Sequence, residues 1–202
     1  MTGRLESILG NADIARLSAA LRARPGKTIA PLGGERYAAI AAVFRLAAES
    51  EPELLMIKRA EQGTDPWSGH VACPGGRMDP RDRDLEETAV RETWEETGID
   101  IRERGQVLGT LDDLAPRIAQ LPPLVIRPYV AVVDPDVTIV SNPEVADAFW
   151  VPLSALRERA SWGLGLVDIR GQSTEVDVFR HNEHTVWGLT ERVLRDLIER
   201  VG

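Results

Sequence analysis

Residues 74–99 combine a glycine turn with an acidic helix, a pairing that few folds can accommodate. Glu92, Glu95 and Glu96 stand at i, i+3 and i+4, so a helix would carry all three carboxylates on one face. Like charges at this spacing destabilise an isolated helix, whereas a hard divalent cation would convert the repulsion into binding. The segment therefore predicts either a cation site or a solvated acidic face, and the solvated face is the better interpretation of a bare E-x-x-E-E.

The residues that bound this helix favour the cation site. Asp84 can cap its first turn, with Glu87 three residues later completing a capping box, and Gly98 can end it beneath the carboxylates. Before the helix, Gly75 and Gly76 follow a short strand-like run, so the backbone can turn tightly there and approach a ligand. Mg²⁺ uses a few carboxylate oxygens of this kind and keeps waters and substrate phosphate oxygens as its other ligands.

The rest of the chain alternates strand-like and helix-like segments. We expect strands over 37–44, 54–57, 71–73, 107–111, 124–133 and 148–151, a hairpin within 166–179, and helices within 5–22 and over 84–97, 152–159 and 185–201. Interleaved strands and helices in 202 residues predict a single α/β or α+β fold. Within it, we expect residues 1–36 to form a helical extension packed on a domain of residues 37–202.

The composition limits the classes of partner that this protein is expected to bind. A net charge of −8 argues against binding to nucleic acid, because a protein that binds it without regard to sequence needs a basic surface. No apolar run reaches the roughly 18–20 residues of a membrane-spanning helix, and the first residues lack a secretory pattern, so we expect a cytoplasmic protein that does not enter membranes. Cys73 is the single cysteine and is expected to be a small buried apolar residue. Surfaces rich in alanine and arginine could support a homodimer.

The acidic helix and its flanks resemble the Nudix box, G-x5-E-x7-R-E-U-x-E-E-x-G-U, in which U is a bulky apolar residue. Arg91-Glu92, Glu95-Glu96 and Gly98-Ile99 match its second half, while Thr93 stands at an apolar position. The spacing from glycine to arginine is one residue longer than in the box, so the earlier box glutamate would fall on Arg83. Five nearby acidic residues leave open which one replaces it: Asp79, Asp82, Asp84, Glu86 and Glu87.

The longer spacing is similar to that of Nudix hydrolases of the coenzyme A pyrophosphatase type, P-G-G-x-x-D-P-x-D-x-D-x-x-x-T-A-x-R-E-x-x-E-E-x-G. Residues 74–98 match every specified position, and with further similar segments the resemblance spans roughly residues 37–200. This subgroup tends to carry R-x-H-x-G-E before the P-G-G. Here Asp65, Trp67 and His70 replace its Arg, His and Glu.

The resemblance implies a Nudix-like α/β/α sandwich, with a mixed sheet between helices, that uses Mg²⁺ or Mn²⁺. It implies hydrolysis of a pyrophosphate bond in a small molecule linked to a nucleoside diphosphate, with coenzyme A or a derivative as the first candidate. ADP-ribose, a nucleotide sugar and a dinucleoside polyphosphate are the alternatives. A non-catalytic nucleotide-binding module and the removal of pyrophosphate or a cap from RNA are further ones.

The resemblance also implies the residues that hold the metal ion and activate water. Glu92, Glu95, Glu96 and the backbone carbonyl of Gly76 are the expected metal ligands. Either Glu92 or Glu144 could be the base that accepts a proton from water. Exposed glutamates are common, so a surface role for Glu144 is as well supported as a catalytic one.

A second group of candidates would position the carboxylates and the substrate. Arg91 is expected at the catalytic site, where its guanidinium could orient Glu95 by a forked pair of hydrogen bonds. Arg59, Gly75 and His70 are the candidate substrate-binding residues. An ion pair is the simpler interpretation of Arg59, and a hydrogen-bonded structural role is the simpler one for His70. Trp187 is expected in the core.

Overall fold

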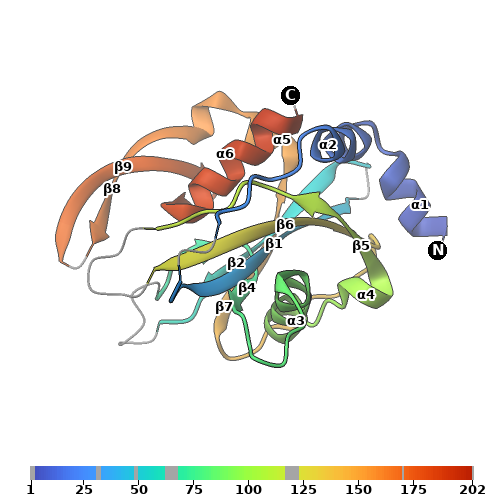
Figure 1. Ribbon diagram of the computed structural model, residues 1–202. Coiled ribbons are helices and arrows are strands. Elements are labelled where there is room, and N and C mark those ends of the chain that lie inside the picture. The colour runs from blue at the N-terminus through green and yellow to red at the C-terminus, as the bar shows by residue number, and fades with distance from the viewer. Residues whose placement is uncertain are drawn as a thin grey trace.

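A mixed β-sheet covered by helices on both faces forms the centre of this computed structural model, which describes residues 3–30, 33–47, 50–61, 68–116, 123–169 and 171–201 (Figure 1). The helices are α1 (Gly3–Gly10), α2 (Ala12–Ala23), α3 (Leu85–Thr97), α4 (Ile101–Arg104), α5 (Leu153–Arg157) and α6 (Leu189–Val201), with a 3₁₀ turn over Arg159–Ser161. The strands are β1 (Arg36–Leu46), β2 (Pro52–Arg59), β3 (Val71–Ala72), β4 (Gly75–Arg77), β5 (Gly105–Thr110), β6 (Leu124–Val133), β7 (Val145–Pro152), β8 (Trp162–Ile169), β9 (Gln172–His181) and β10 (His184–Trp187). Within the described ranges, no helix is long and apolar enough to cross a membrane.

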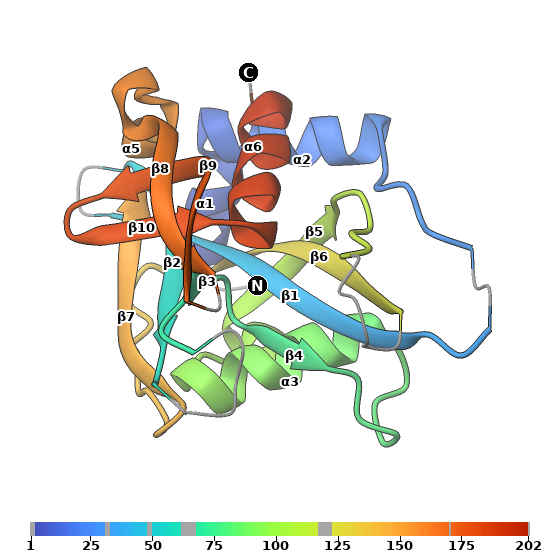
Figure 2. The ribbon, with the colours of Figure 1, turned by 90° about the vertical axis from the view of Figure 1, so that its left-hand side faces the viewer.

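The central sheet has the strand order β3-β2-β1-β6-β5, with β4 also paired to β1 and β7 also paired to β2. β1 and β6 run parallel, whereas the other named pairs of this sheet are antiparallel. Helices on both sides bury the parallel pair, which explains the nearly continuous apolar runs of both strands. The predicted α/β/α sandwich with a mixed sheet is therefore confirmed, and Figure 2 shows the sheet between α3 on one side and α2 and α6 on the other.

Two apolar clusters fill the layers, because alternate residues of each strand face opposite sides of the sheet. Phe44 belongs to the cluster beneath α1, α2, α5 and α6, and Val43 to the cluster beneath α3 and α4. Both side chains are fully buried. Cys73 is also buried, as expected. The second cluster fixes α3 against the sheet, and the acidic helix of the sequence analysis is this α3.

The helical region predicted within residues 5–22 is confirmed as two helices. Asn11 separates them, because its side-chain oxygen accepts hydrogen bonds from the backbone N–H groups of Asp13 (3.0 Å) and Ile14 (3.3 Å) and so caps α2. α2 then packs against α6 and β5. The division of the chain between residues 36 and 37 stays a prediction.

A second sheet, with the order β10-β9-β8, carries the long β8–β9 hairpin that projects from the left of Figure 1. The helix predicted over 185–201 is wrong in its first turn, because residues 184–187 form β10 and pair with β9. Gly188, with φ of 69°, then lets the chain turn into α6. Trp187, expected in the core, is only partly buried.

Candidate active site

Local hydrogen bonds fix both ends of α3. At its start, the side chain of Asp84 accepts a hydrogen bond from the Glu87 N–H at 2.8 Å, and at its end Gly98 adopts a left-handed conformation with φ of 70°. The predicted capping box is only half correct. The Glu87 carboxylate accepts from the backbone N–H of Arg83 and from the guanidinium groups of Arg83 and Arg102, each at 2.8 Å.

Strand β4 brings the glycine turn against α3. A Cβ atom on Gly75, whose φ is 155°, would lie 2.4 Å from the carbonyl oxygen of Ala39. A Cβ atom on Gly76 would lie 2.6 Å from both carboxylate oxygens of Glu92. Any side chain at residue 76 would therefore occupy the space of this carboxylate, which explains why the turn needs glycine there.

Alanine in place of Gly76 should displace the Glu92 carboxylate and weaken Mn²⁺ binding by about 10- to 100-fold, as loss of a positioning contact at a metal site does. The clash involves the end of a flexible side chain, so we expect the melting temperature to stay close to that of wild type. Gly10→Ala is the matched control, because a Cβ atom there meets nothing within 4 Å. Unchanged Mn²⁺ affinity in Gly76→Ala would show that the position of Glu92 does not matter for cation binding.

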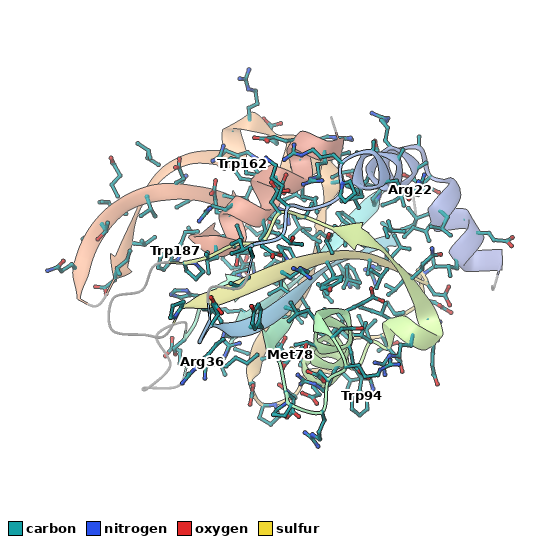
Figure 3. The ribbon with its side chains drawn as sticks, viewed as in Figure 1. Arg22, Arg36, Met78, Trp94, Trp162 and Trp187 are labelled. Atoms are coloured by element: carbon teal, nitrogen blue, oxygen red, sulfur yellow. The ribbon has the colours of Figure 1, made fainter. Side chains whose placement is uncertain are left out.

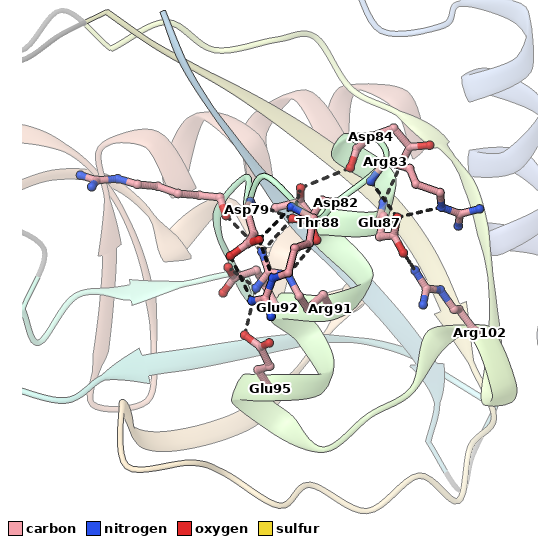
Figure 4. A network of polar contacts seen from close by, with 12 residues as sticks. Asp79, Asp82, Arg83, Asp84, Glu87, Thr88, Arg91, Glu92, Glu95 and Arg102 are labelled. Atoms are coloured by element: carbon pink, nitrogen blue, oxygen red, sulfur yellow. Dashed lines mark hydrogen bonds and ion pairs between the residues drawn. The ribbon is translucent and has the colours of Figure 1, made fainter.

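Arg91 organises the acidic face of α3 (Figure 4). Its Nε and Nη2 atoms each donate to one oxygen of the Asp82 carboxylate at 2.9 Å. Its Nη1 atom donates to Glu92 at 2.8 Å and to Glu95 at 2.9 Å, and Nη2 also donates to the carbonyl of Arg77 at 3.1 Å. One guanidinium thus fixes two of the three helix carboxylates relative to the glycine turn.

Asp82 is the acidic residue before α3 that pairs with Arg91. It is 8% exposed, and it also accepts hydrogen bonds from the Thr88 hydroxyl and the Asp79 N–H, both at 2.9 Å. The Arg91 guanidinium holds the pKa of Asp82 well below its usual range, at about 2. Of the five acidic residues, Asp82 is therefore the one that holds Arg91. The sequence shows no signal that separates it from its neighbours.

Glu96 is the most buried of the three helix carboxylates, with 3% exposed. It accepts a hydrogen bond from the Gly75 N–H at 2.8 Å, and its Oε1 atom lies 3.6 Å from Nη1 of Arg59. Burial raises the pKa of Glu96 to about 7, with the charges of Glu92 and Glu144 adding to the increase and Gly75 and Arg59 opposing it. In this environment, a bound cation would be favoured because it offsets the charge of the Glu96 carboxylate.

Glu144 lies within electrostatic reach of the helix carboxylates, although it is far from them in sequence. It directly precedes β7, where the register against β2 shifts between Lys58 and Arg59, and its carbonyl accepts a hydrogen bond from the Ala60 N–H at 2.8 Å. Its charge raises the pKa of Glu92, although burial is the main cause of that increase. The charge of Glu144 thus acts on both Glu92 and Glu96.

The remaining candidates lie along the same edge of the sheet. Arg59 contacts Glu96, so the ion pair that the sequence suggested is present. His70 is opposite Arg59, whose backbone N–H donates to the His70 carbonyl at 2.9 Å, and the His70 ring contacts Trp187. Asp65 and Trp67 lie outside the described residues.

The donor set fits a divalent cation of the Mg²⁺ type. Among residues that the structure describes, no group of three or more His, Cys, Asp or Glu side chains is arranged to hold a metal ion by itself. Mg²⁺ sites are usually open in this way, because they combine one or two carboxylates with waters and phosphate oxygens. Burial and the charges of neighbouring glutamates raise the pKa values of Glu92 and Glu96, and a cation would relieve both effects. Both side chains lie against the glycine turn, with Glu92 beside Gly76 and Glu96 at the Gly75 N–H.

The sequence of this chain is similar to those of known proteins. A family model described as NUDIX domain matches residues 36–167, more than half of the chain. An uncharacterized Nudix hydrolase NudL of Photorhabdus laumondii is 34% identical over 167 residues, covering 82% of this chain and 85% of the relative. The human mitochondrial coenzyme A diphosphatase NUDT8 is 33% identical over 181 residues, covering 88% of this chain and 70% of the relative.

Solved structures show the same fold at lower identity. A MutT/nudix family protein from Enterococcus faecalis superposes with a TM-score of 0.57 and 16% identity, over 87% of this chain and 65% of that one. A NUDIX hydrolase from Alicyclobacillus acidocaldarius gives 0.56 and 20%, over 84% and 93% of the two chains. At these identities the likeness concerns the fold alone.

Proposed function

The chain belongs to the Nudix hydrolase family, and from this premise we propose that it hydrolyses the pyrophosphate bond of a small molecule linked to a nucleoside diphosphate, with coenzyme A or a derivative as the first candidate. The observation that carries the proposal is the set of carboxylates that Arg91 and the glycine turn hold together. The 33% identity with a human coenzyme A diphosphatase supports the choice of first substrate.

Glu92, Glu96 and the Gly76 carbonyl would hold Mg²⁺ or Mn²⁺, with Glu95 as a further ligand. When bound, the ion would neutralise charge on the phosphate oxygens and favour ionisation of a nearby water. Arg91 keeps Glu92 and Glu95 oriented throughout the reaction. Arg59 would bind a phosphate oxygen through its guanidinium. As the water oxygen bonds to phosphorus, a carboxylate accepts the proton, the bridging P–O bond breaks, and the leaving phosphate retains the electron pair.

Two glutamates remain candidates for the base, and Glu144 is the first one to test. Glu144→Gln should lower kcat by about 10²- to 10⁴-fold, the usual contribution of a general base, while Mn²⁺ still binds with wild-type affinity. Steady-state kinetics and a manganese titration give the two readouts. A wild-type kcat in this variant would assign the base to Glu92, and a loss of Mn²⁺ affinity would instead make Glu144 a metal ligand.

A panel of diphosphates tests the substrate class. Coenzyme A, ADP-ribose, a nucleotide sugar and a dinucleoside polyphosphate are incubated with Mg²⁺, and product release is followed by chromatography. Hydrolysis at a pyrophosphate bond supports the proposal, and the ranking of kcat/KM identifies the preferred group. No turnover of any member would favour the non-catalytic nucleotide-binding module, against which the complete set of helix carboxylates argues.

Further predictions concern long RNA as a substrate, the cellular location and the oligomeric state. The net charge of −8 argues against long RNA as a substrate, because a polyanion would need a basic surface. A cytoplasmic location and a homodimer remain predictions.

A further inference from the structure

An aromatic pair lies at the end of β10, which packs beside β3. The rings of His70 and Trp187 have centroids 4.4 Å apart and an interplanar angle of 55°, and both residues are partly exposed. The side chain of Trp187 is labelled in Figure 3. The indole N–H of Trp162 donates to the Leu156 carbonyl, whereas that of Trp187 has no acceptor among the described residues. Since no buried side-chain nitrogen in those residues lacks a partner, the Trp187 N–H must face solvent. Trp187 is therefore partly exposed to solvent, which a core residue is not.

Sheet register connects this pair to the candidate active site. In the antiparallel β2–β3 pairing, Lys58 lies opposite Val71, and the next pair outward is Arg59 with His70. Side chains directly opposite each other share one face of the sheet and lie about 5 Å apart at Cβ. The Arg59 guanidinium extends to within 3.6 Å of Glu96. The glutamate, the arginine, the histidine and the indole thus follow one another along a single edge.

We propose that the exposed ring surface of Trp187 and His70 binds the nucleobase of the substrate by stacking, with Arg59 between the base and the pyrophosphate. The inference rests on the proposed function, because it assigns one half of that substrate to a surface. A tryptophan offers a large rigid apolar face with little loss of conformational entropy, and every base has a π-face that can stack on it.

Binding of ADP and of inorganic pyrophosphate, each with Mg²⁺, separates the base from the phosphates. Trp187→Ala should raise the Kd for ADP by about 5- to 100-fold, the range measured when a base loses its aromatic partner, and leave the Kd for pyrophosphate unchanged. With any nucleotide substrate that turns over, KM should rise and kcat should stay near wild type. Trp187→Phe, which keeps a ring, should retain most of the ADP affinity. Trp94→Phe is the matched control, because Trp94 is 57% exposed on α3.

A structural role for Trp187 predicts different results. Equal weakening of ADP and pyrophosphate, or no weakening of either in a variant that melts like wild type, would overturn the proposal, as would wild-type protein that does not bind ADP. If Trp187→Ala does not fold, Trp187→Leu and His70→Ala replace it, since each of them removes one ring of the pair. Wild-type protein that binds ADP through Trp187 and hydrolyses no diphosphate would contradict the hydrolase proposal and leave this one standing.

Discussion

Glu96→Gln is expected to abolish diphosphate hydrolysis, with kcat/KM falling by about 10³-fold or more, because a metal ion contributes several kcal/mol of charge stabilisation in the transition state. The Glu96 carboxylate is 3% exposed and lies beside the glycine turn, where it accepts a hydrogen bond from the Gly75 N–H. The glutamine oxygen can still accept the hydrogen bond from the Gly75 N–H, so the fold should be retained. Steady-state kinetics with Mg²⁺ and a Mn²⁺ titration measure the two losses.

Glu86→Gln provides the control for this experiment. Glu86 is exposed in the first turn of the same helix and accepts no hydrogen bond within the described chain, so its variant should keep wild-type kinetics and Mn²⁺ affinity. Wild-type turnover by the Glu96 variant would remove this carboxylate from the metal site. A loss of activity with unchanged Mn²⁺ affinity would mean that Glu96 acts on the substrate or the water instead.

The same substitution should change how stability depends on pH. Burial raises the pKa of Glu96 from 4.5 to about 7, so the folded protein binds this proton more tightly than the unfolded chain does. The stabilisation is complete below the unfolded value and is lost as the pH rises through the folded one. Without metal, the melting temperature of wild type should therefore fall relative to that of Glu96→Gln between about pH 5 and pH 8. Parallel melting curves across this range would contradict the raised pKa.

Local signals predicted the acidic helix well, and non-local pairing explains where prediction failed. Asp84 and Gly98 bound α3 by hydrogen bonds and backbone geometry within a few residues, so the sequence was sufficient to locate it. Residues 184–187 carry the apolar spacing of a helix, yet they form a strand because β9 supplies backbone partners that the segment itself does not reveal. The sequence therefore predicts elements that local contacts stabilise better than those that pairing creates.

The candidate site divides in the same way. The spacing on α3 was enough to place Glu92, Glu95 and Glu96 together, because helix geometry alone determines it. The choice of Asp82 as the partner of Arg91 depends on how the turn before α3 folds back, and five acidic residues were equally possible in sequence. The nearness of Glu144 depends on the pairing of β2 with β7, which joins residues more than eighty positions apart.

Arg91→Lys is expected to lower kcat/KM by about 10- to 100-fold, the usual effect of losing a residue that orients metal ligands. A lysine ammonium is a single point of charge and cannot reach both oxygens of Asp82 while donating to Glu92 and Glu95. Arg104→Lys is the control, because Arg104 pairs with the buried Asp134 at the end of β6, away from the glycine turn. Arg104→Lys should lose little stability and should keep wild-type kinetics.

Removing the guanidinium entirely should also destabilise the fold. Arg91→Ala leaves Asp82, 8% exposed, without its cation, and breaking a buried pair in this way costs about 3–5 kcal/mol, which lowers the melting temperature by roughly 6–20 °C in a chain of this size. The double variant with Asp82→Ala should recover part of this stability, because no unpaired charge remains, but no activity, since Glu92 and Glu95 are still released. Recovery of both would mean that Arg91 serves only to neutralise Asp82, and recovery of neither would mean that Arg91 stabilises α3 independently of Asp82.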